Sequence, residues 1–155
     1  MRYSQELPPD QDPINHCIAR LSNYKVNKPF GGSYVTITFH SGLTVAALLD
    51  SGNEWRSVIS DGFARKLGFG ENELQTLQGA NVQTAAKGGR MCVLGELPRE
   101  VSFQFDGCPA AGRFVFRPAV LKSLAMDVNV SRGFMAYHRM TQHHGENLLT
   151  IKGHR

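Results

Sequence analysis

The chain has 155 residues, of which 41% are hydrophobic and 19% are charged. This length suits one domain with its own core, and the composition excludes a chain that is disordered throughout. The formal net charge is +4, but the basic residues are scattered and not interleaved with aromatic ones, so nucleic-acid binding is not expected. No stretch approaches the ~18–20 apolar residues of a membrane span, and the N-terminus lacks a signal-peptide pattern, so neither membrane association nor secretion is expected.

The three cysteines are predicted to be free thiols. Cys17, Cys92 and Cys108 are odd in number and have no metal-site spacing, which favours a reducing compartment. We therefore expect a cytoplasmic protein or one associated with an intracellular particle. The histidines within 138–144 lack a paired Cys or carboxylate at zinc-ligand spacing, so no metal or cofactor is expected.

The predicted elements fall into two parts. Residues 1–32 form a polar, proline-rich segment, interpreted as an arm or linker with one short helix from Ile14 to Leu21. Residues 33–152 carry strand patterns separated by turn residues. Strands are predicted at 34–39, 43–49, 80–86, 91–94, 101–105, 113–117, 128–130 and 148–151, with a short apolar piece at 57–59, and helices are predicted at 60–67, 118–124 and 133–140. This order predicts a mainly β domain, a small closed barrel with two or three short helices.

The most informative motif lies at the end of the second predicted strand. The apolar run Val45–Leu49 leads directly into Asp50, Ser51 and Gly52. Asp-Ser-Gly is a common turn, because Asp and Ser bond nearby backbone and Gly permits positive φ. An aspartate at the end of a rigid strand, beside a hydroxyl, can also be half of an aspartic-protease dyad. The tripeptide alone leaves both interpretations open.

Two further segments accompany this motif. Residues 84–95 form a predicted hairpin with a glycine tip and a Val-Leu-Gly exit, and residues 127–135 read as an apolar strand, a small residue, an arginine and a helix. In this order and spacing, the chain resembles the retroviral-type aspartic proteases, or retropepsins. It is most similar to those of retroelements (retrotransposons) and to the retroviral-like domains of ubiquitin-shuttling proteins. The resemblance covers about residues 33–152.

The resemblance implies an aspartic endopeptidase that acts as a homodimer. Two carboxylates that share one proton can activate water and supply a proton to the departing amine. The chain has one Asp-[Ser/Thr]-Gly after an apolar strand, so the second carboxylate would be Asp50 of another copy. The implied substrate is an extended peptide, such as a junction of a retroelement polyprotein.

The resemblance also assigns roles next to Asp50 and at the hairpin tip. Ser51 would hydrogen-bond across the dyad, and Gly52 would let the backbone pass close to the shared water. Lys87, Gly88 and Gly89 would form the tip of a flap that closes over the substrate. The alternative for Ser51 is a hydroxyl that only stabilises the turn, and the alternative for residues 87–89 is an ordinary hairpin turn. Cys92, in the return strand, is expected to pack.

Glu54 and Trp55 follow the motif and are predicted to contact substrate. By the resemblance, Glu54 would also pair with Arg132 and brace the dimer region. Trp55 is either a subsite wall or a core anchor. Ser131 stands where the family has Gly, which would add strain if that position required positive φ.

Two other functions remain open from the sequence. One is a catalytically silent retropepsin-like domain that serves as a dimerisation or peptide-binding module. The other is a β-barrel binding domain in which Asp-Ser-Gly is only a turn.

Overall fold

A computed structural model describes residues 17–23, 32–77, 81–83, 90–143 and 145–152. The helices are α1 (Asp61–Lys66) and α2 (Arg132–Tyr137), with short 3-10 turns η3 (Glu71–Glu73) and η4 (Pro109–Ala111). The strands are β1 (Cys17–Arg20), β2 (Ser22–Asn23), β3 (Ser33–Phe39), β4 (Thr44–Leu49), β5 (Val58–Ser60), β6 (Asn81–Gln83), β7 (Arg90–Glu96), β8 (Val101–Phe105), β9 (Phe114–Phe116), β10 (Ala119–Leu121), β11 (Val128–Val130), β12 (Met140–His143) and β13 (Leu148–Ile151).

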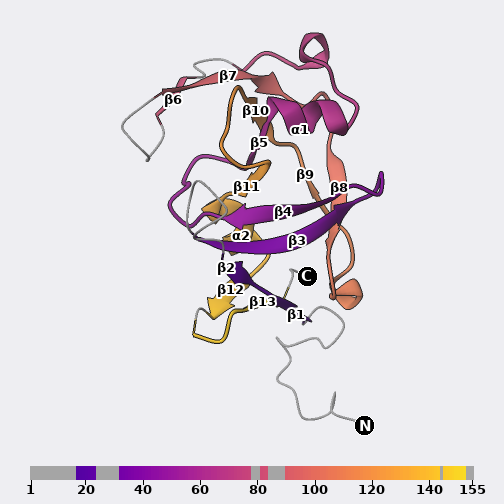
Figure 1. The fold of residues 1–155 in the computed structure, drawn as a ribbon, viewed down its shortest axis with the longest axis vertical. Coiled ribbons are helices and arrows are strands. Elements are labelled where there is room, and N and C mark those ends of the chain that lie inside the picture. Colours follow the sequence, from indigo (N-terminus) through magenta and orange to yellow (C-terminus); the bar gives the residue numbers. More distant parts are fainter. Residues whose placement is uncertain (1–16, 24–31, 78–80, 84–89, 144, 153–155) are drawn as a thin grey trace.

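The strands form two sheets (Figure 1). The large sheet has ten strands in the order β6-β7-β10-β5-β11-β4-β3-β8-β9, with β2 paired to β3, and it curls as a half-barrel with β6 and β9 at its ends. The small sheet has the order β1-β13-β12 and lies at the lower end of the view in Figure 1. The prediction of a mainly β fold with few, short helices is confirmed.

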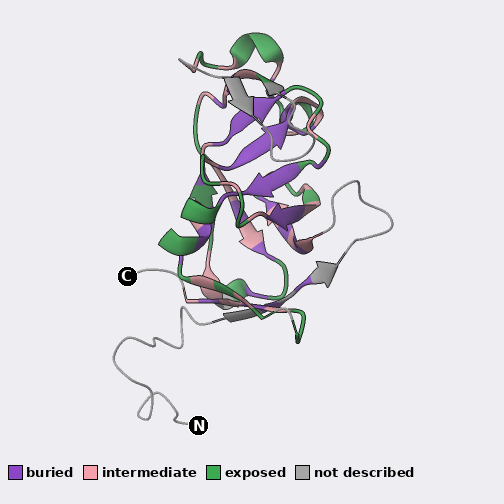
Figure 2. Cartoon of the chain, turned by 90° about the vertical axis from the view of Figure 1, so that its left-hand side faces the viewer, coloured by how far each residue is buried: buried purple, intermediate pink, exposed green. Residues whose placement is uncertain are grey.

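Phenylalanine side chains from the large sheet fill the core. Phe103 on β8 is 0% exposed, and its ring centroid lies 5.6 Å from that of Phe39 and 5.2 Å from that of Phe116. β8 alternates as predicted, with Phe103 and Phe105 buried between partly exposed neighbours. Figure 2 shows the buried residues concentrated on the strands of the large sheet. Burial of these rings contributes to stability through the apolar area removed from water.

The helix α1 begins and ends at the predicted signals. The Ser60 hydroxyl accepts a hydrogen bond from the Phe63 N–H at 3.0 Å, which satisfies one free donor of the first turn. Gly68 follows the helix with φ of +99°, a conformation in which glycine is favoured. Phe63 and Ala64 are buried against the core, so this short helix is held by its cap and one apolar face.

The predicted helix over Ile14–Leu21 is wrong over its described part. β1 pairs antiparallel with β13, with Ala19 opposite Leu149, and β2 pairs with β3. Ala19 and Leu21 are 2% and 5% exposed and belong to the main core. An open strand edge of β13 decides the conformation here, since sheet pairing overrides local propensity. Residues 17–23 are therefore part of the fold, while a domain boundary at residue 32 stays a prediction.

The predicted helix at 118–124 is also wrong. Residues Ala119–Leu121 form β10, which lies between β7 and β5 and is buried along its whole length. A short apolar run buried on both faces cannot be told from a helix by periodicity. The last predicted helix ends early, at Tyr137, because Arg139 adopts φ of +56° and Met140 begins β12.

The cysteines differ from the prediction. Cys108 is buried and disulfide-bonded, so the expectation of free thiols is wrong for this residue. A disulfide removes the basis for the expected reducing compartment. Cys92 is free and exposed, which also corrects its expected packing role.

Helices of the described residues are all too short or too polar to serve as membrane spans.

Replacement of Phe103 tests the position of the core. Phe103→Ala removes a fully buried ring and should lower the free energy of unfolding by about 3–5 kcal/mol. Val115→Ala is the matched control, because Val115 on the neighbouring strand is 49% exposed and should change stability by less than about 0.5 kcal/mol. Urea unfolding measures both. Equal effects of the two substitutions would contradict this core.

Candidate active site

Asp50 lies where two parallel strands end side by side. β4 and β11 pair in parallel, with Leu48 opposite Asn129 and Leu49 opposite Val130. The Asp50 N–H continues this ladder by donating to the Val130 carbonyl at 3.0 Å. Beyond the strands, the Arg132 N–H donates to the Asn53 carbonyl at 2.9 Å. The turn that carries Asp50 is thus held to the end of β11 on both sides.

Both carboxylate oxygens of Asp50 accept hydrogen bonds. The Gly52 N–H donates to Oδ1 at 3.0 Å, and the Asn129 side-chain amide donates to Oδ2 at 2.9 Å. Asp50 is half-buried, so one side of the carboxylate stays open to a ligand or a partner chain. Two donors on one carboxylate define the plane in which it lies.

Asn129 was missed by the sequence reasoning. Side chains alternate along a strand, so residues of neighbouring strands that are opposite one another share a face. Leu48 lies opposite Asn129, and Asp50 follows Leu48 by two residues, which places Asp50 and Asn129 on one face. The only signal in the sequence was a polar residue between two valines, Val128 and Val130. It becomes informative only once the register is known.

Asn53 joins this arrangement from the same turn. Its Oδ1 accepts from the Trp55 N–H at 3.0 Å. Its Nδ2 donates to the Arg56 carbonyl at 2.8 Å and to Asn129 Oδ1 at 2.9 Å. The chain of hydrogen bonds therefore runs from a backbone N–H through two side-chain amides to Asp50.

The other two residues of the Asp-Ser-Gly motif are exposed to solvent. Ser51 and Gly52 are exposed. A Cβ at Gly52 would lie 3.3 Å from Asp50 Oδ1, a tight contact that favours glycine where the backbone passes the carboxylate. A hydrogen bond of Ser51 across a dyad needs a second chain and stays a prediction.

Glu54 and Arg132 form the contact expected of them. Arg132 Nη1 donates to Glu54 Oε2 at 3.0 Å, with side chains that are 61% and 74% exposed. At such exposure the pair contributes under about 1 kcal/mol, and its bracing of a dimer stays a prediction. Trp55 is 43% exposed, so the core-anchor interpretation is wrong. The Arg56 guanidinium lies 5.8 Å from the centroid of the Trp55 ring.

Ser131 needs no special backbone conformation. Its φ is −78°, in the extended region, and its hydroxyl accepts from the Phe134 N–H at 3.2 Å to cap α2. The Ser131 N–H donates to the buried Ser57 hydroxyl at 3.0 Å. Serine at this position, where the retropepsins that the sequence resembles have glycine, therefore adds a helix cap and no strain.

The predicted flap is only partly described. β6 and β7 pair antiparallel, with Gln83 opposite Arg90. Lys87, Gly88 and Gly89 lie outside the described residues, so their role at a flap tip stays a prediction.

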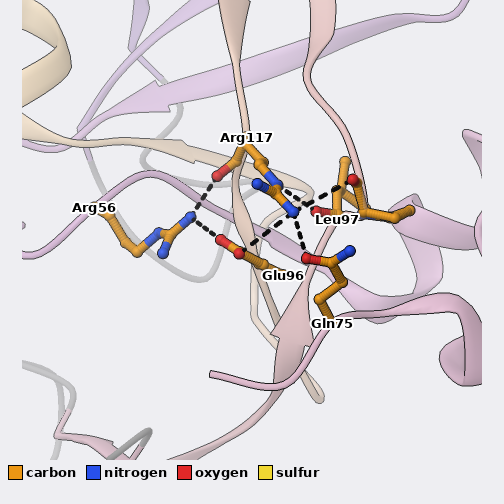
Figure 3. A network of polar contacts seen from close by, with 6 residues as sticks. Arg56, Gln75, Glu96, Leu97 and Arg117 are labelled. Carbon is orange, nitrogen blue, oxygen red and sulfur yellow. Dashed lines mark hydrogen bonds and ion pairs between the residues drawn. The ribbon is translucent and has the colours of Figure 1, made fainter. Parts of the chain in front are cut away.

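A charged network holds the base of this hairpin, as Figure 3 shows. Glu96, at the end of β7, accepts from Arg56 at 2.8 Å, and its other oxygen lies 3.6 Å from Arg117. Arg117 also donates to the Leu97 carbonyl at 2.8 Å and to Gln75 at 2.6 Å. Arg56 follows the Asp50 turn, so the network connects the hairpin to the segment that leaves the site.

No three His, Cys, Asp or Glu side chains gather to hold a metal ion within the described part of the chain. His138 packs against aromatic rings, with centroid distances of 4.4 Å to Phe134 and 4.8 Å to Phe114. His143 lies 2.9 Å from the Thr150 hydroxyl. Both contacts give these histidines a structural role.

Glu96→Gln tests the network. The substitution leaves two arginines without their carboxylate, whose side chain is only 16% exposed, and should lower the free energy of unfolding by about 1–3 kcal/mol. Glu100→Gln, at an exposed position nearby, should have an effect below about 0.5 kcal/mol. Thermal unfolding of both variants measures the difference. An unchanged midpoint for Glu96→Gln would show that the network is not coupled to folding.

Comparison with known proteins identifies the fold. No protein-family model matches the sequence, and a search of curated proteins gives no match. Among solved structures, the retroviral protease-like domain of Ddi1 from Leishmania major superposes with a TM-score of 0.56 at 20% identity, over 79% of this chain and 93% of that one. A retropepsin-like aspartic protease from Rickettsia conorii superposes with a TM-score of 0.52 at 13% identity, over 88% and 89% of the two chains. The chain has the fold of the retropepsin-like aspartic proteases.

Proposed function

We propose that this protein is an aspartic endopeptidase that acts as a homodimer, with Asp50 of each chain forming the catalytic dyad. The observation that carries the proposal is the placement of Asp50. On a retropepsin-like fold, it lies at the end of β4 with both oxygens held by donors. The sequence has one Asp-[Ser/Thr]-Gly after an apolar strand, so in this proposal a second copy of the chain completes the site.

The proposed reaction needs no cofactor. Two carboxylates at ~3 Å cannot both be ionised, so the dyad holds one proton between them. The ionised carboxylate takes a proton from water as the water oxygen attacks the peptide carbonyl carbon. The protonated carboxylate first polarises the carbonyl oxygen, and a proton then passes to the departing nitrogen as the C–N bond breaks.

The proposed substrate is an extended peptide. Such a peptide binds as an added strand, where main-chain hydrogen bonds give affinity and side-chain pockets give specificity. Glu54 and Trp55 are exposed directly after the Asp50 turn, where they can contact such a strand. The β6–β7 hairpin would cover it as a flap, with Lys87, Gly88 and Gly89 at the tip. We propose the junctions of a retroelement polyprotein as natural targets.

Asp50→Asn tests the proposal. The purified chain should cleave members of a peptide library at mildly acidic pH, and Asp50→Asn should lower kcat by at least about a thousandfold, because neutral Asn cannot activate water. Asp106→Asn is the matched control, since Asp106 is an exposed aspartate that also precedes a glycine. It should leave cleavage unchanged. Equal cleavage by Asp50→Asn and the unmodified chain would exclude the dyad.

A mixing experiment tests whether the two carboxylates come from different chains. After equal amounts of unmodified and Asp50→Asn chains exchange, about a quarter of the dimers carry two Asp50 residues. Activity per unmodified chain should therefore fall by about half. Unchanged activity would show that one chain is sufficient. A dimer seen by sedimentation that cleaves no peptide would instead favour the catalytically silent module.

A further inference from the structure

We propose that Asn129, with its amide orientation set by Asn53, is a positioning residue that holds the Oδ2 atom of Asp50 as a hydrogen-bond acceptor. The inference rests on the endopeptidase function proposed above and assigns to Asn129 and Asn53 a part in it. Neither residue touches the peptide in this proposal. They act through the carboxylate of Asp50.

The direction of the hydrogen-bond chain is set by the backbone. The Trp55 N–H can only donate, so the atom of Asn53 that faces it at 3.0 Å must be Oδ1. Asn53 Nδ2 then faces two acceptors, the Arg56 carbonyl at 2.8 Å and Asn129 Oδ1 at 2.9 Å. Asn129 must in turn present Nδ2 to Asp50, at 2.9 Å from Oδ2. A flip of either amide would place oxygen against oxygen or a donor against a donor.

Burial makes this orientation costly to lose. Asn129 is 7% exposed, so water cannot readily replace its partners, and an unsatisfied buried amide is expensive. Asn53 is half-buried, and its side-chain oxygen and nitrogen are both engaged. The two amides thus form a fixed donor beside Asp50.

The consequence for the dyad is geometric. The Gly52 N–H holds Oδ1 at 3.0 Å, and Asn129 holds Oδ2 at 2.9 Å, so rotation of the carboxylate about its Cβ–Cγ bond breaks both contacts. The pair of donors therefore keeps the carboxylate plane constant through the reaction.

Two substitutions separate this role from packing. Asn129→Leu keeps a similar side-chain shape and removes the donor. Asn53→Asp keeps an acceptor for the Trp55 N–H but offers an acceptor to Asn129, which turns the Asn129 amide and points its oxygen at Asp50. Asn72→Leu is the control, an exposed asparagine on η3 outside the hydrogen-bond chain.

Steady-state kinetics give the first readout. Each of the two variants should lower kcat about tenfold to a hundredfold, the range expected for a lost hydrogen bond to a charged group, with KM within about twofold. Asn53→Asp should lower kcat less in the Asn129→Leu background than alone, because the part of its effect that passes through Asn129 is already lost and only the lost contact with the Arg56 carbonyl remains. A change in KM alone, an unchanged kcat, or multiplying effects in the double variant would each overturn the proposal. If Asn129→Leu does not fold, Asn53→Asp alone tests the contact.

A second readout does not depend on activity. The Asn129 side-chain amide protons, observed by nuclear magnetic resonance, should exchange slowly with solvent in the unmodified chain and faster in Asp50→Ala and Asn53→Asp. Exchange as fast as that of the exposed Asn72 amide would overturn the contact. If the unmodified chain cleaves no peptide, the proposed function fails, and the exchange rates still decide whether Asn53 and Asn129 hold Asp50.

Discussion

The parallel pairing of β4 with β11 is the constraint on which the candidate site depends. These strands are separated by many residues in the sequence, yet they pair in register and end together. The Asp50 N–H donates to the Val130 carbonyl at 3.0 Å, so the first residue beyond one strand is fixed to the other. A shift of this register by one residue would turn Asn129 away from Asp50. The same shift would move Ser131, which follows β11 and caps α2, relative to the Asp50 turn.

The surroundings of the site combine rigid and exposed parts. Carboxylate, amide and backbone groups hold one another within the turn at 50–53, and the buried phenylalanine core supports the strands that deliver them. The pair of Glu54 with Arg132 is exposed on both sides, as is Trp55. A reactive group is placed more precisely on a strand or helix than on a free loop. Asp50 directly follows β4 and is hydrogen-bonded to the end of β11.

The sequence predicted the elements that local patterns determine. The alternation at 101–105, the apolar run before Asp50 and the Ser60 cap each carry a local signal, and each element forms where expected. The helix predicted at 118–124 failed because β10 is buried on both faces between β7 and β5. The helix predicted over Ile14–Leu21 failed because β1 pairs with β13, which lies far away in the sequence. Asn129 was missed for the same reason, since its importance comes from a long-range register.

The pairing of β1 with β13 also bears on the order in which the protein is made. β1 is the first described strand, and its partner, Leu148–Ile151, is the last. Synthesis proceeds from the N-terminus, so the small sheet cannot close until almost all of the fold has left the ribosome. The entropy of closing so long a loop opposes this pairing until its contacts form. During translation, Leu149 and Ile151 would therefore be among the last residues to join the core that they share with Ala19 and Leu21.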